Sequence, residues 1–299
     1  MMQTTMDLEF HYPQIDDASW AAPLLRAAGR MGCEYSFTTM FMWRMFYQNR
    51  IARWQDTLFI STGEEAPFYL PPIGPSLEEG IGFLLERTGR QGRALKLVGA
   101  DATIVERLEE AYPGRFRFTS QRGDFDYIYR TEDLAQLPGS AYHSKRNHIA
   151  GFSRKFDWSY EPISDRNTAE VEAMATEWCR QKGNCQDKGL KSENCAIREV
   201  LRNREALSVR GGLIRVDGQV AAFTFGSPIN ERVFDIQVEK ALPAYPGAYA
   251  VINREFASTL GEFAFLNREN DLNIEGLRKA KLSYHPAMIL EKYTCTEVK

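Results

Sequence analysis

The spacing of apolar positions predicts helices and strands that alternate along the whole chain. Apolar residues recur at helical spacing over residues 17–30, 76–87, 101–112, 144–156, 168–181, 192–202, 247–260 and 274–282. Extended apolar runs predict strands at residues 57–62, 67–70, 95–98, 126–129, 158–161, 206–216, 219–225, 233–238, 262–266 and 287–293. Such mixing favours an α/β fold with α+β layering over an all-helical protein.

Turn-forming residues divide this pattern at two places. Asp217 and Gly218 separate two extended runs and predict a tight hairpin. Pro138, Gly139 and Ser140 interrupt any regular element, because proline and glycine favour turns. We therefore expect two domains, residues 1–137 and residues 138–299, with the second carrying the functional cleft and the first mainly structural.

Composition and charge narrow the class of protein. The 299 residues are 43% hydrophobic and 26% charged, which is typical of globular proteins and excludes disordered and coiled-coil classes. The formal net charge of -3 means that any contact with nucleic acid needs a local basic patch. No apolar run is long enough to cross a bilayer and no export signal is visible, so we expect a cytoplasmic protein without an integral membrane segment.

Several familiar kinds of site are missing from the sequence. The five cysteines form no CxxC pair, and the four histidines lack metal-ligand spacing, so we expect neither a metal site nor a disulfide framework. No phosphate loop, dinucleotide-binding glycine motif, nucleophile elbow or HExxH helix occurs. Because no serine or cysteine stands beside a recognisable base, we expect any group transfer to proceed by direct attack, without a covalent enzyme intermediate.

The order of elements in the second half resembles the GNAT-type acyltransferase fold. A helix pair is followed by three antiparallel strands, a helix, a strand, a short helix and a last strand. In that fold two strands splay apart, and a helix N-terminus at the opening faces the pyrophosphate of the acyl donor. Gly247 and Ala248 occupy this helix start, although Pro243 and Pro246 remove two amide donors. The alternative interpretation is that Pro246 and Gly247 only begin a helix.

Two longer strings carry a sharper resemblance. Residues 142–156 (YHSKRNHIAGFSRKF) and 265–286 (FLNRENDLNIEGLRKAKLSYHP) resemble soluble proteins related to the C-terminal domain of phosphatidylglycerol lysyltransferases. Residues 33–43 (CEYSFTTMFMW) are a weaker third match, and the resemblance covers essentially the whole chain. It implies two GNAT-like domains with mixed, mostly antiparallel sheets. It also implies transfer of an aminoacyl group from aminoacyl-tRNA to an amine or hydroxyl acceptor, such as a small molecule, a peptide or a lipid headgroup.

The charged string at residues 267–284 supplies most of the candidate site. The candidate catalytic residues are Glu269, Asp271, Arg278, Lys281 and Tyr284, and the candidate donor-binding residues are Asn267, Arg268, Gly247, Ala248, Lys145 and Arg146. The cationic side chains can orient a phosphate or an oxyanion, and the carboxylates can hold an α-ammonium or take a proton. Residues 277–284 resemble a helix of GNAT-type enzymes in which a tyrosine at the position of Tyr284 acts as a general acid, and the alternative is an aromatic side chain packed beside Pro286. The alternative is a solvated loop whose opposite charges pair with one another.

Lys145 and Arg146 begin a basic helix that has two interpretations. Its positive face can bind tRNA phosphates, in which case affinity falls steeply with salt. It can equally be an ordinary amphipathic helix.

Two other functions remain open at this stage. One is an N-acyltransferase that uses acyl-CoA as its cofactor and acts on a small molecule or a peptide. The other is a ligand-binding module that keeps the fold without catalysis.

Overall fold

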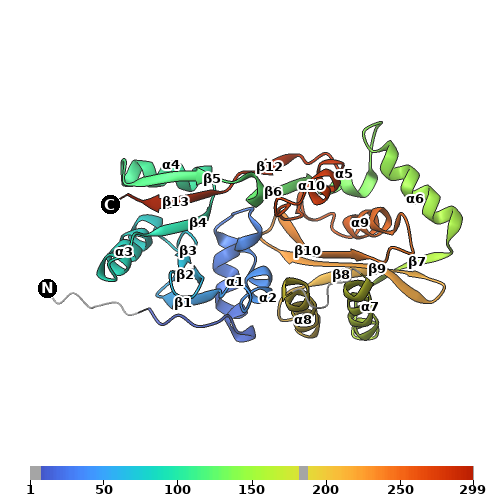
Figure 1. Ribbon diagram of the computed structural model, residues 1–299, viewed down its shortest axis with the longest axis horizontal. Helices are drawn as coiled ribbons and strands as arrows, with labels where there is room; N and C mark the ends of the chain where they lie inside the picture. The colour runs from blue at the N-terminus through green and yellow to red at the C-terminus, as the bar shows by residue number, and fades with distance from the viewer. Residues whose placement is uncertain (1–7, 182–187, 299) are drawn as a thin grey trace.

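Two β-sheets lie side by side in the protein, each covered by helices (Figure 1). The computed structural model describes residues 8–181 and 188–298. The helices are α1 (Ala18–Ala27), α2 (Phe37–Met42), α3 (Leu77–Arg90), α4 (Ala102–Ala111), α5 (Thr131–Gln136), α6 (His143–Lys155), α7 (Thr168–Gln181), α8 (Lys188–Arg202), α9 (Ala248–Ser258) and α10 (Glu275–Leu282). Three short 3-10 helices are η1 (Ile15–Asp17), η2 (Cys33–Tyr35) and η3 (Arg122–Asp124).

The strands form one sheet in each half of the molecule. They are β1 (Arg50–Trp54), β2 (Thr57–Thr62), β3 (Phe68–Tyr69), β4 (Lys96–Ala100), β5 (Phe116–Ser120), β6 (Asp126–Arg130), β7 (Trp158–Pro162), β8 (Arg210–Val216), β9 (Gln219–Pro228), β10 (Val233–Ala241), β11 (Phe265–Asn267), β12 (Met288–Leu290) and β13 (Tyr293–Glu297). The first sheet has the order β1-β2-β3-β4-β13-β5, and the second has the order β12-β6-β11-β10-β9-β8-β7. The strand pairs β3/β4 and β10/β11 are parallel and the other pairs are antiparallel, so the predicted mixed, mostly antiparallel sheets are confirmed.

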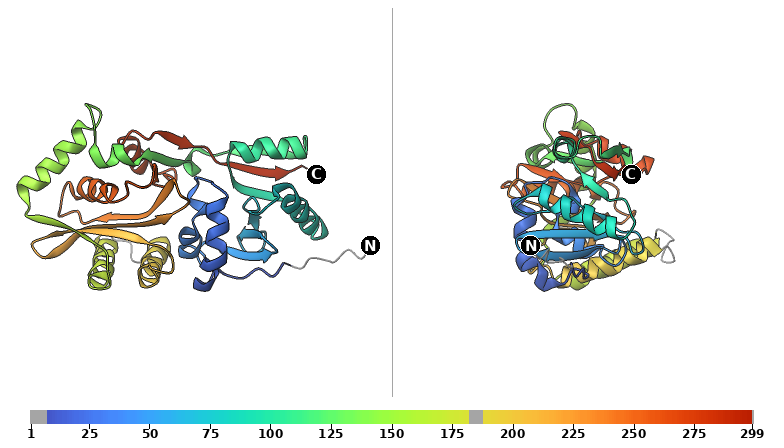
Figure 2. Two further views of the ribbon diagram at one scale, coloured as in Figure 1. Left: turned by 180° about the vertical axis from the view of Figure 1, so that it is seen from behind. Right: turned by 90° about the vertical axis from the view of Figure 1, so that its left-hand side faces the viewer.

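The two halves repeat one topology and exchange one strand each. In both, a hairpin and a third antiparallel strand lead through a helix to a parallel strand, then through a second helix to an edge strand. Strand β6 then crosses to lie between β11 and β12, and β13 crosses back to lie between β4 and β5 (Figure 2). Sheet pairing therefore crosses residue 137 in both directions, and the predicted domain boundary there stays a prediction.

Local sequence features start the elements where the pattern indicated. The Ser76 hydroxyl accepts the amide of Glu79 at the start of α3, and Asp101 accepts the amide of Ile104 at the start of α4. Asp217 has a positive φ of 48° between β8 and β9, which confirms the predicted hairpin.

One predicted strand is wrong. Residues 287–293 form no single strand, because β12 pairs with β6 in the second sheet whereas β13 pairs with β4 and β5 in the first. Lys292 lies between them and is 9% exposed, with its ammonium 2.8 Å from the Asp126 carboxylate. The sequence pattern does not reveal that the chain passes from one sheet to the other here, because the residues before and after Lys292 are all extended.

The second sheet lies between two helical layers, and this sandwich positions the site. Phe152 of α6 and Val251 of α9 pack on one face. On the other face, Val200 of α8 shares a core with Phe41 of α2 and Ile51 of β1, so helices and strands of the first half complete this layer. In the described part of the chain, no helix has both the length and the apolar character that crossing a bilayer requires.

Candidate functional site

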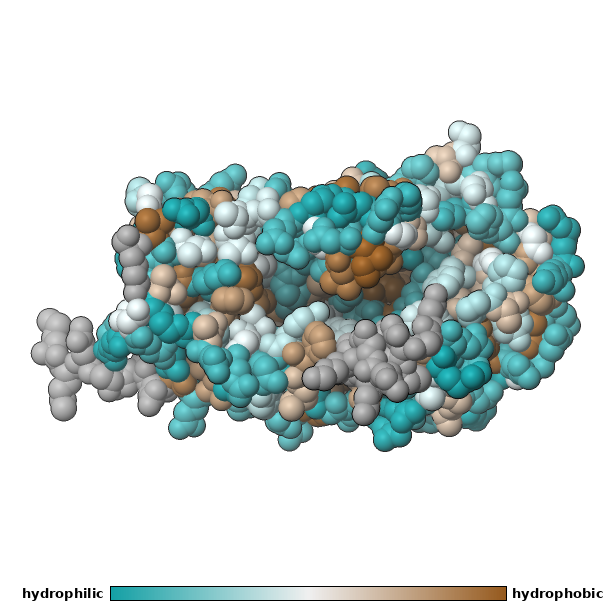
Figure 3. All heavy atoms as spheres, in the orientation of Figure 1, coloured by the Kyte–Doolittle hydropathy of each residue, from teal (hydrophilic) through white to brown (hydrophobic). Residues whose placement is uncertain are grey.

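Strands β10 and β11 separate in the middle of the second sheet. They pair only from Val233–Phe265 to Asp235–Asn267, after which β11 ends and β10 continues to Ala241. A register shift between Asp235 and Val238 bends β10 at the same point. The opening meets the loop at residues 268–274, which we call the charged loop. A hollow crosses this face of the molecule near α10 and the start of β10 (Figure 3).

Asn267 anchors the start of the charged loop between the two halves. Its side-chain amide donates to the Met31 carbonyl and to the Asp126 carboxylate, both at 2.8 Å, and its amide oxygen accepts the Glu269 backbone N–H at 2.6 Å. Because Asn267 is fully buried and all these bonds are internal, its role is to shape the loop. Glu269 is left with a positive φ of 54°.

Arg268 is held in a buried ion pair beside two aromatic rings. Its guanidinium lies 2.8 Å from the Glu239 carboxylate, and Asn253 of α9 donates to the same carboxylate at 3.1 Å. The guanidinium carbon lies 4.7 Å from the centre of the Tyr284 ring. The Arg268 Nη1 atom is buried and has no hydrogen-bond partner among the described residues. One donor therefore remains for a ligand.

Glu269 and Lys281 form the most perturbed pair of the site. The Lys281 ammonium donates to the backbone carbonyls of Arg268 and Glu269, the latter at 3.1 Å. Burial lowers the pKa of Lys281 to about 8, and burial raises the pKa of Glu269 to about 8, although the Lys281 charge opposes that rise. The Glu269 carboxylate makes no hydrogen bond or ion pair with the side chains of residues 8–181 and 193–298. It is available as a base or as an acceptor for a cation.

Asp271 lies two residues further on and is fully satisfied. The Tyr127 hydroxyl donates to it at 2.6 Å, and Arg278 contacts both of its oxygens, at 2.7 and 3.0 Å. The amide of Asn273 donates at 2.9 Å. The hydrogen bonds from Arg278 hold the pKa of the buried Asp271 carboxyl well below its usual range. Asp271 and Arg278 thus clamp the charged loop onto β6.

These contacts bring residues that are distant in the sequence together at the opening between β10 and β11. Comparison with known proteins gives this site a context. Residues 25–296 match the family described as phosphatidylglycerol lysyltransferase, C-terminal. The chain belongs to this family. A protein of unknown function from Bacteroides thetaiotaomicron is 36% identical in its crystal structure, with a TM-score of 0.93 over 98% of this chain and 100% of that chain. A search of the curated proteins found no match.

Two further solved structures share the fold at lower identity. L-PGS from Bacillus licheniformis has a TM-score of 0.70 and 15% identity, over 96% of this chain and 93% of that chain. The C-terminal domain of a putative lysylphosphatidylglycerol synthetase from Agrobacterium fabrum has a TM-score of 0.69 and 12% identity, over 95% and 92%. The predicted family and the predicted fold of two GNAT-like α/β units are confirmed.

Within this family fold, the predicted helix start at Gly247 faces protein. Gly247 has a φ of 97°, and an added Cβ would lie 2.9 Å from the His148 carbonyl oxygen of α6. The Ala248 amide donates to the Tyr245 carbonyl at 3.1 Å. These contacts explain the glycine without a ligand, and donor binding by Gly247 and Ala248 stays a prediction.

The two basic residues of α6 have different surroundings. The Lys145 ammonium lies 2.6 Å from the Ser283 hydroxyl and 3.8 Å from the centre of the Tyr284 ring, which places it at the cleft. Burial and the nearby Arg268 lower the pKa of Lys145 to about 8. Arg146 donates instead to the carbonyls of Leu137 and Gly139. Arg146 thus fixes the connection before α6.

Tyr284 is buried between Lys145 and Arg268, and its phenol is a weaker acid than usual. Burial raises the pKa of Tyr284, although the Arg268 charge opposes the rise. Its backbone carbonyl accepts the Tyr142 hydroxyl at 2.9 Å. Its predicted role as a general acid is therefore less favoured by the surroundings than a role as a platform for Arg268 and Lys145.

Sequence reasoning missed the polar side chains of β10 and the acid–ammonium cluster beneath them. Asp235, Gln237 and Glu239 stand at every second position of β10, between residues that are apolar up to Val238, and that spacing was the available signal. Below them, ligand-type atoms of Cys33, Glu34 and Asp126 lie within 4.8 Å of one another. The Lys292 ammonium lies 2.8 Å from Asp126 and 3.5 Å from the Cys33 sulfur, so this cluster already contains a cation.

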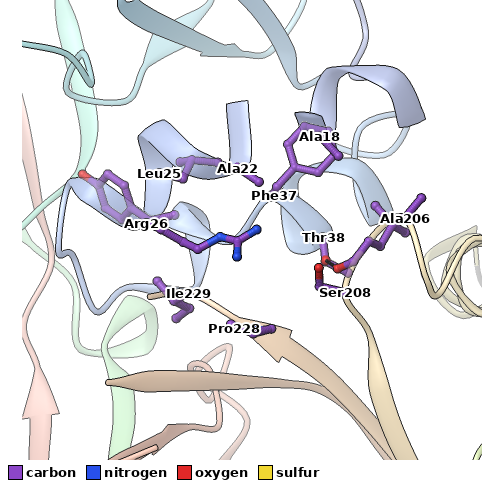
Figure 4. Close-up of a pocket in the computed structure, with 12 residues that line it drawn as sticks. Ala18, Ala22, Leu25, Arg26, Phe37, Thr38, Ala206, Ser208, Pro228 and Ile229 are labelled. Carbon is purple, nitrogen blue, oxygen red and sulfur yellow. Dashed lines mark hydrogen bonds between the residues drawn. The ribbon is translucent and has the colours of Figure 1, made fainter. Parts of the chain in front are cut away.

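A separate small cavity lies between the two halves, away from the candidate site residues. It holds about 40 Å³ and is lined by α1, residues 206–208 and the end of β9. The Arg26 guanidinium points into it (Figure 4). None of the predicted site residues lines it.

Proposed function

We propose that this protein transfers an aminoacyl group from aminoacyl-tRNA to an amine or hydroxyl acceptor at the opening between β10 and β11. The observation that carries this proposal is the buried pair Glu269 and Lys281 beside Arg268, which has an unused donor. Membership of a family described as lysyltransferases supports an acyl-transfer role. Family membership does not identify the donor, so aminoacyl-tRNA as the donor needs its own test.

Direct transfer requires a base, an oxyanion donor and a positioned nucleophile. Glu269 takes the proton from the attacking amine or hydroxyl as that atom bonds to the ester carbonyl carbon. Arg268 Nη1 donates to the carbonyl oxygen while it carries negative charge. The bond from carbon to the ribose oxygen of the tRNA then breaks, and that oxygen takes the proton back from Glu269.

The surroundings of the cleft are suited to a polyanionic donor. Lys145 reaches the cleft from the first turn of α6, and Arg154 and Lys155 are exposed at the other end of that helix. Together they offer positive charge along one element in a chain with a net charge of -3. This local patch supports contact with tRNA phosphates, whereas the acceptor can be a small molecule, a peptide or a lipid headgroup.

Acyl-CoA is the competing donor, and the fold alone permits it. A GNAT-like opening exists, but the start of α9 packs against α6 and its first amide is already bonded. A pyrophosphate would have to displace those contacts. This observation favours the ester donor on tRNA.

The test is a transfer assay with both labelled donors. Purified protein is incubated with tRNA carrying a labelled amino acid, and separately with labelled acetyl-CoA, together with a panel of amine and hydroxyl acceptors. We expect labelled product from the tRNA alone, and a loss of about 100-fold or more in Lys281→Met. Lys279→Met is the matched control, because Lys279 is exposed and pairs with Glu275 on the same helix. Transfer from acetyl-CoA, or from neither donor, would overturn the proposal, and the second result would favour a binding module.

A further inference from the structure

A second polar cluster lies on the opposite side of β10 from the Arg268–Glu239 pair. Glu239 faces Asn253 of α9, whereas Asp235 and Gln237 contact α2 of the first half. Thr39 donates to Asp235 Oδ2 at 2.8 Å, and the Gln237 amide donates to the Ser227 hydroxyl at 2.8 Å. We call Asp235, Gln237, Thr39, Ser36 and Ser227 the junction cluster, since both halves build it.

The junction cluster has acceptors without donors. Asp235 is fully buried and Gln237 is 7% exposed. Asp235 Oδ1 and Gln237 Oε1 nevertheless have no hydrogen-bond partner in the described part of the chain. Buried acceptors in native proteins almost always have a donor, because an unpaired one keeps the full cost of losing water. Two neighbouring unpaired acceptors indicate that N–H or O–H groups are missing from this place.

The region around Asp235 contains more carboxyl groups than cations. The carboxyl groups of Glu269 and Asp126 act on Asp235, and Lys292 is the cation that acts on it. Lys292 is already engaged by Glu34 and by Asp126 at 2.8 Å. The Lys281 charge acts on Glu269, but the Glu269 carboxylate forms no ion pair with a side chain that the structure describes. Two ammonium groups, of Lys281 and Lys292, thus face four carboxyl groups, of Glu34, Asp126, Asp235 and Glu269.

We propose that the junction cluster is a subsite for a primary ammonium group, with Asp235 Oδ1 and Gln237 Oε1 accepting two of its N–H bonds and Glu269 adding negative charge. An ammonium group supplies both the missing donors and the missing charge. In the transfer reaction it is the amino group of the aminoacyl donor or of an amino-acid-like acceptor. That assignment rests on the proposed function, whereas binding of the ammonium group does not.

Binding of an ammonium group changes the proton affinity of Asp235. Burial and the neighbouring Glu269 and Asp126 raise the pKa of Asp235, while Thr39 and Lys292 oppose the rise. An ammonium group beside Oδ1 favours the ionised carboxylate and therefore lowers that pKa. A neutral ligand of the same shape does not.

The experiment is calorimetric titration of the full chain with alaninamide and with lactamide, in which a hydroxyl replaces the amine. We expect alaninamide to bind at least about tenfold more tightly, because only its ammonium group supplies both the missing donors and the missing charge. Asp235→Asn should weaken alaninamide binding about tenfold or more and leave lactamide binding unchanged. Asp165→Asn, at an exposed position, is the control and should change neither affinity.

The outcomes separate this subsite from the proposed function. Equal binding of the two amides, or no binding of alaninamide, would overturn the subsite, whatever the transfer assay shows. Preferential binding of alaninamide would support it even if no aminoacyl transfer occurred. If Asp235→Asn fails to fold, as judged by thermal unfolding, the comparison of alaninamide with lactamide on the unmodified chain still shows whether the subsite prefers an ammonium group.

Discussion

Glu269 and Asp271 stand two residues apart in the sequence and lie in opposite electrostatic surroundings. Asp271 accepts hydrogen bonds from Tyr127, Arg278 and the Asn273 amide, whereas Glu269 has none on its carboxylate in the described part of the chain. The sequence identified both as candidates because both are carboxylates in the string that resembles the family. Their difference depends mainly on Arg278 of α10, to which Tyr127 of β6, 144 residues before Asp271, adds a hydrogen bond. Because Arg278 follows both carboxylates closely in the sequence, spacing alone could not assign it to Asp271.

At the residue scale, the pH dependence of transfer tests the assignment of Glu269 and Lys281. Glu269 must lose its proton to act as a base, and Lys281 must keep its proton so that its charge favours the ionised Glu269 and its N–H bonds hold the charged loop. Both pKa values are about 8, so the rate should rise with pH below about 8 and fall above it. The two apparent values belong to the pair. A rate profile that is flat from pH 6.5 to 9, measured in single turnover, would exclude this pair as the titrating groups.

Asp271 gives a second prediction, on stability. Its pKa is lowered in the folded protein, so the ionised form stabilises the fold above pH about 4 and that contribution is lost as the pH falls. Asp271→Asn should unfold about 2 kcal/mol more easily at pH 7, because buried charge-assisted bonds are weakened. The gap between variant and unmodified protein should close toward pH 2. Urea unfolding at several pH values measures this, and a gap that widens in acid would contradict it.

At the scale of single elements, the pattern of apolar residues located most helices and the central strands. It failed where long-range contacts decide the structure, as at β12 and β13. Those strands read as one run in the sequence, and the buried ion pairs of Lys292 with Glu34 and Asp126 mark where the chain changes sheets. Strand β3 has only two residues and pairs with β4 at a single position, Tyr69 with Leu97.

Gly247 supports a prediction at the same scale. Gly247→Ala should destabilise the protein by about 2 kcal/mol, since its φ of 97° and the His148 carbonyl 2.9 Å away both oppose a Cβ. Gly89→Ala in α3 is the matched control, because an added Cβ there meets nothing within 4 Å. That control should stabilise the protein by about 0.5 kcal/mol. Thermal unfolding of both variants measures the contrast, and equal shifts would argue against a packed helix start.

At the scale of the whole molecule, the exchange of β6 and β13 ties the two halves together. The sequence indicated two halves that each mix helices and strands, separated by a turn at residues 138–140, but it carried no sign that each half contributes a strand to the other. Strand exchange depends on pairing across more than 100 residues, which periodicity cannot detect. The exchange also brings Asp126 of β6 beneath the cleft, next to Asn267.

The exchange predicts that neither half is independent. A fragment of residues 138–299 lacks β6, whose Tyr127 and Tyr129 side chains are fully buried, and leaves β13 without its partners. We expect this fragment alone to show no cooperative thermal unfolding, and a mixture with residues 1–137 to recover it. Cooperative unfolding of the isolated fragment would mean that the exchanged strand is dispensable.

The central claim, that Glu269 at the β10/β11 opening acts in aminoacyl transfer, has one direct measurement. The single-turnover rate from charged tRNA is compared for the unmodified protein, Glu269→Gln and Glu275→Gln. Glu275 is the control because it is exposed and lies on the adjacent helix. We predict a loss of about 100-fold or more for Glu269→Gln and little change for Glu275→Gln. Equal rates for all three proteins would contradict the account.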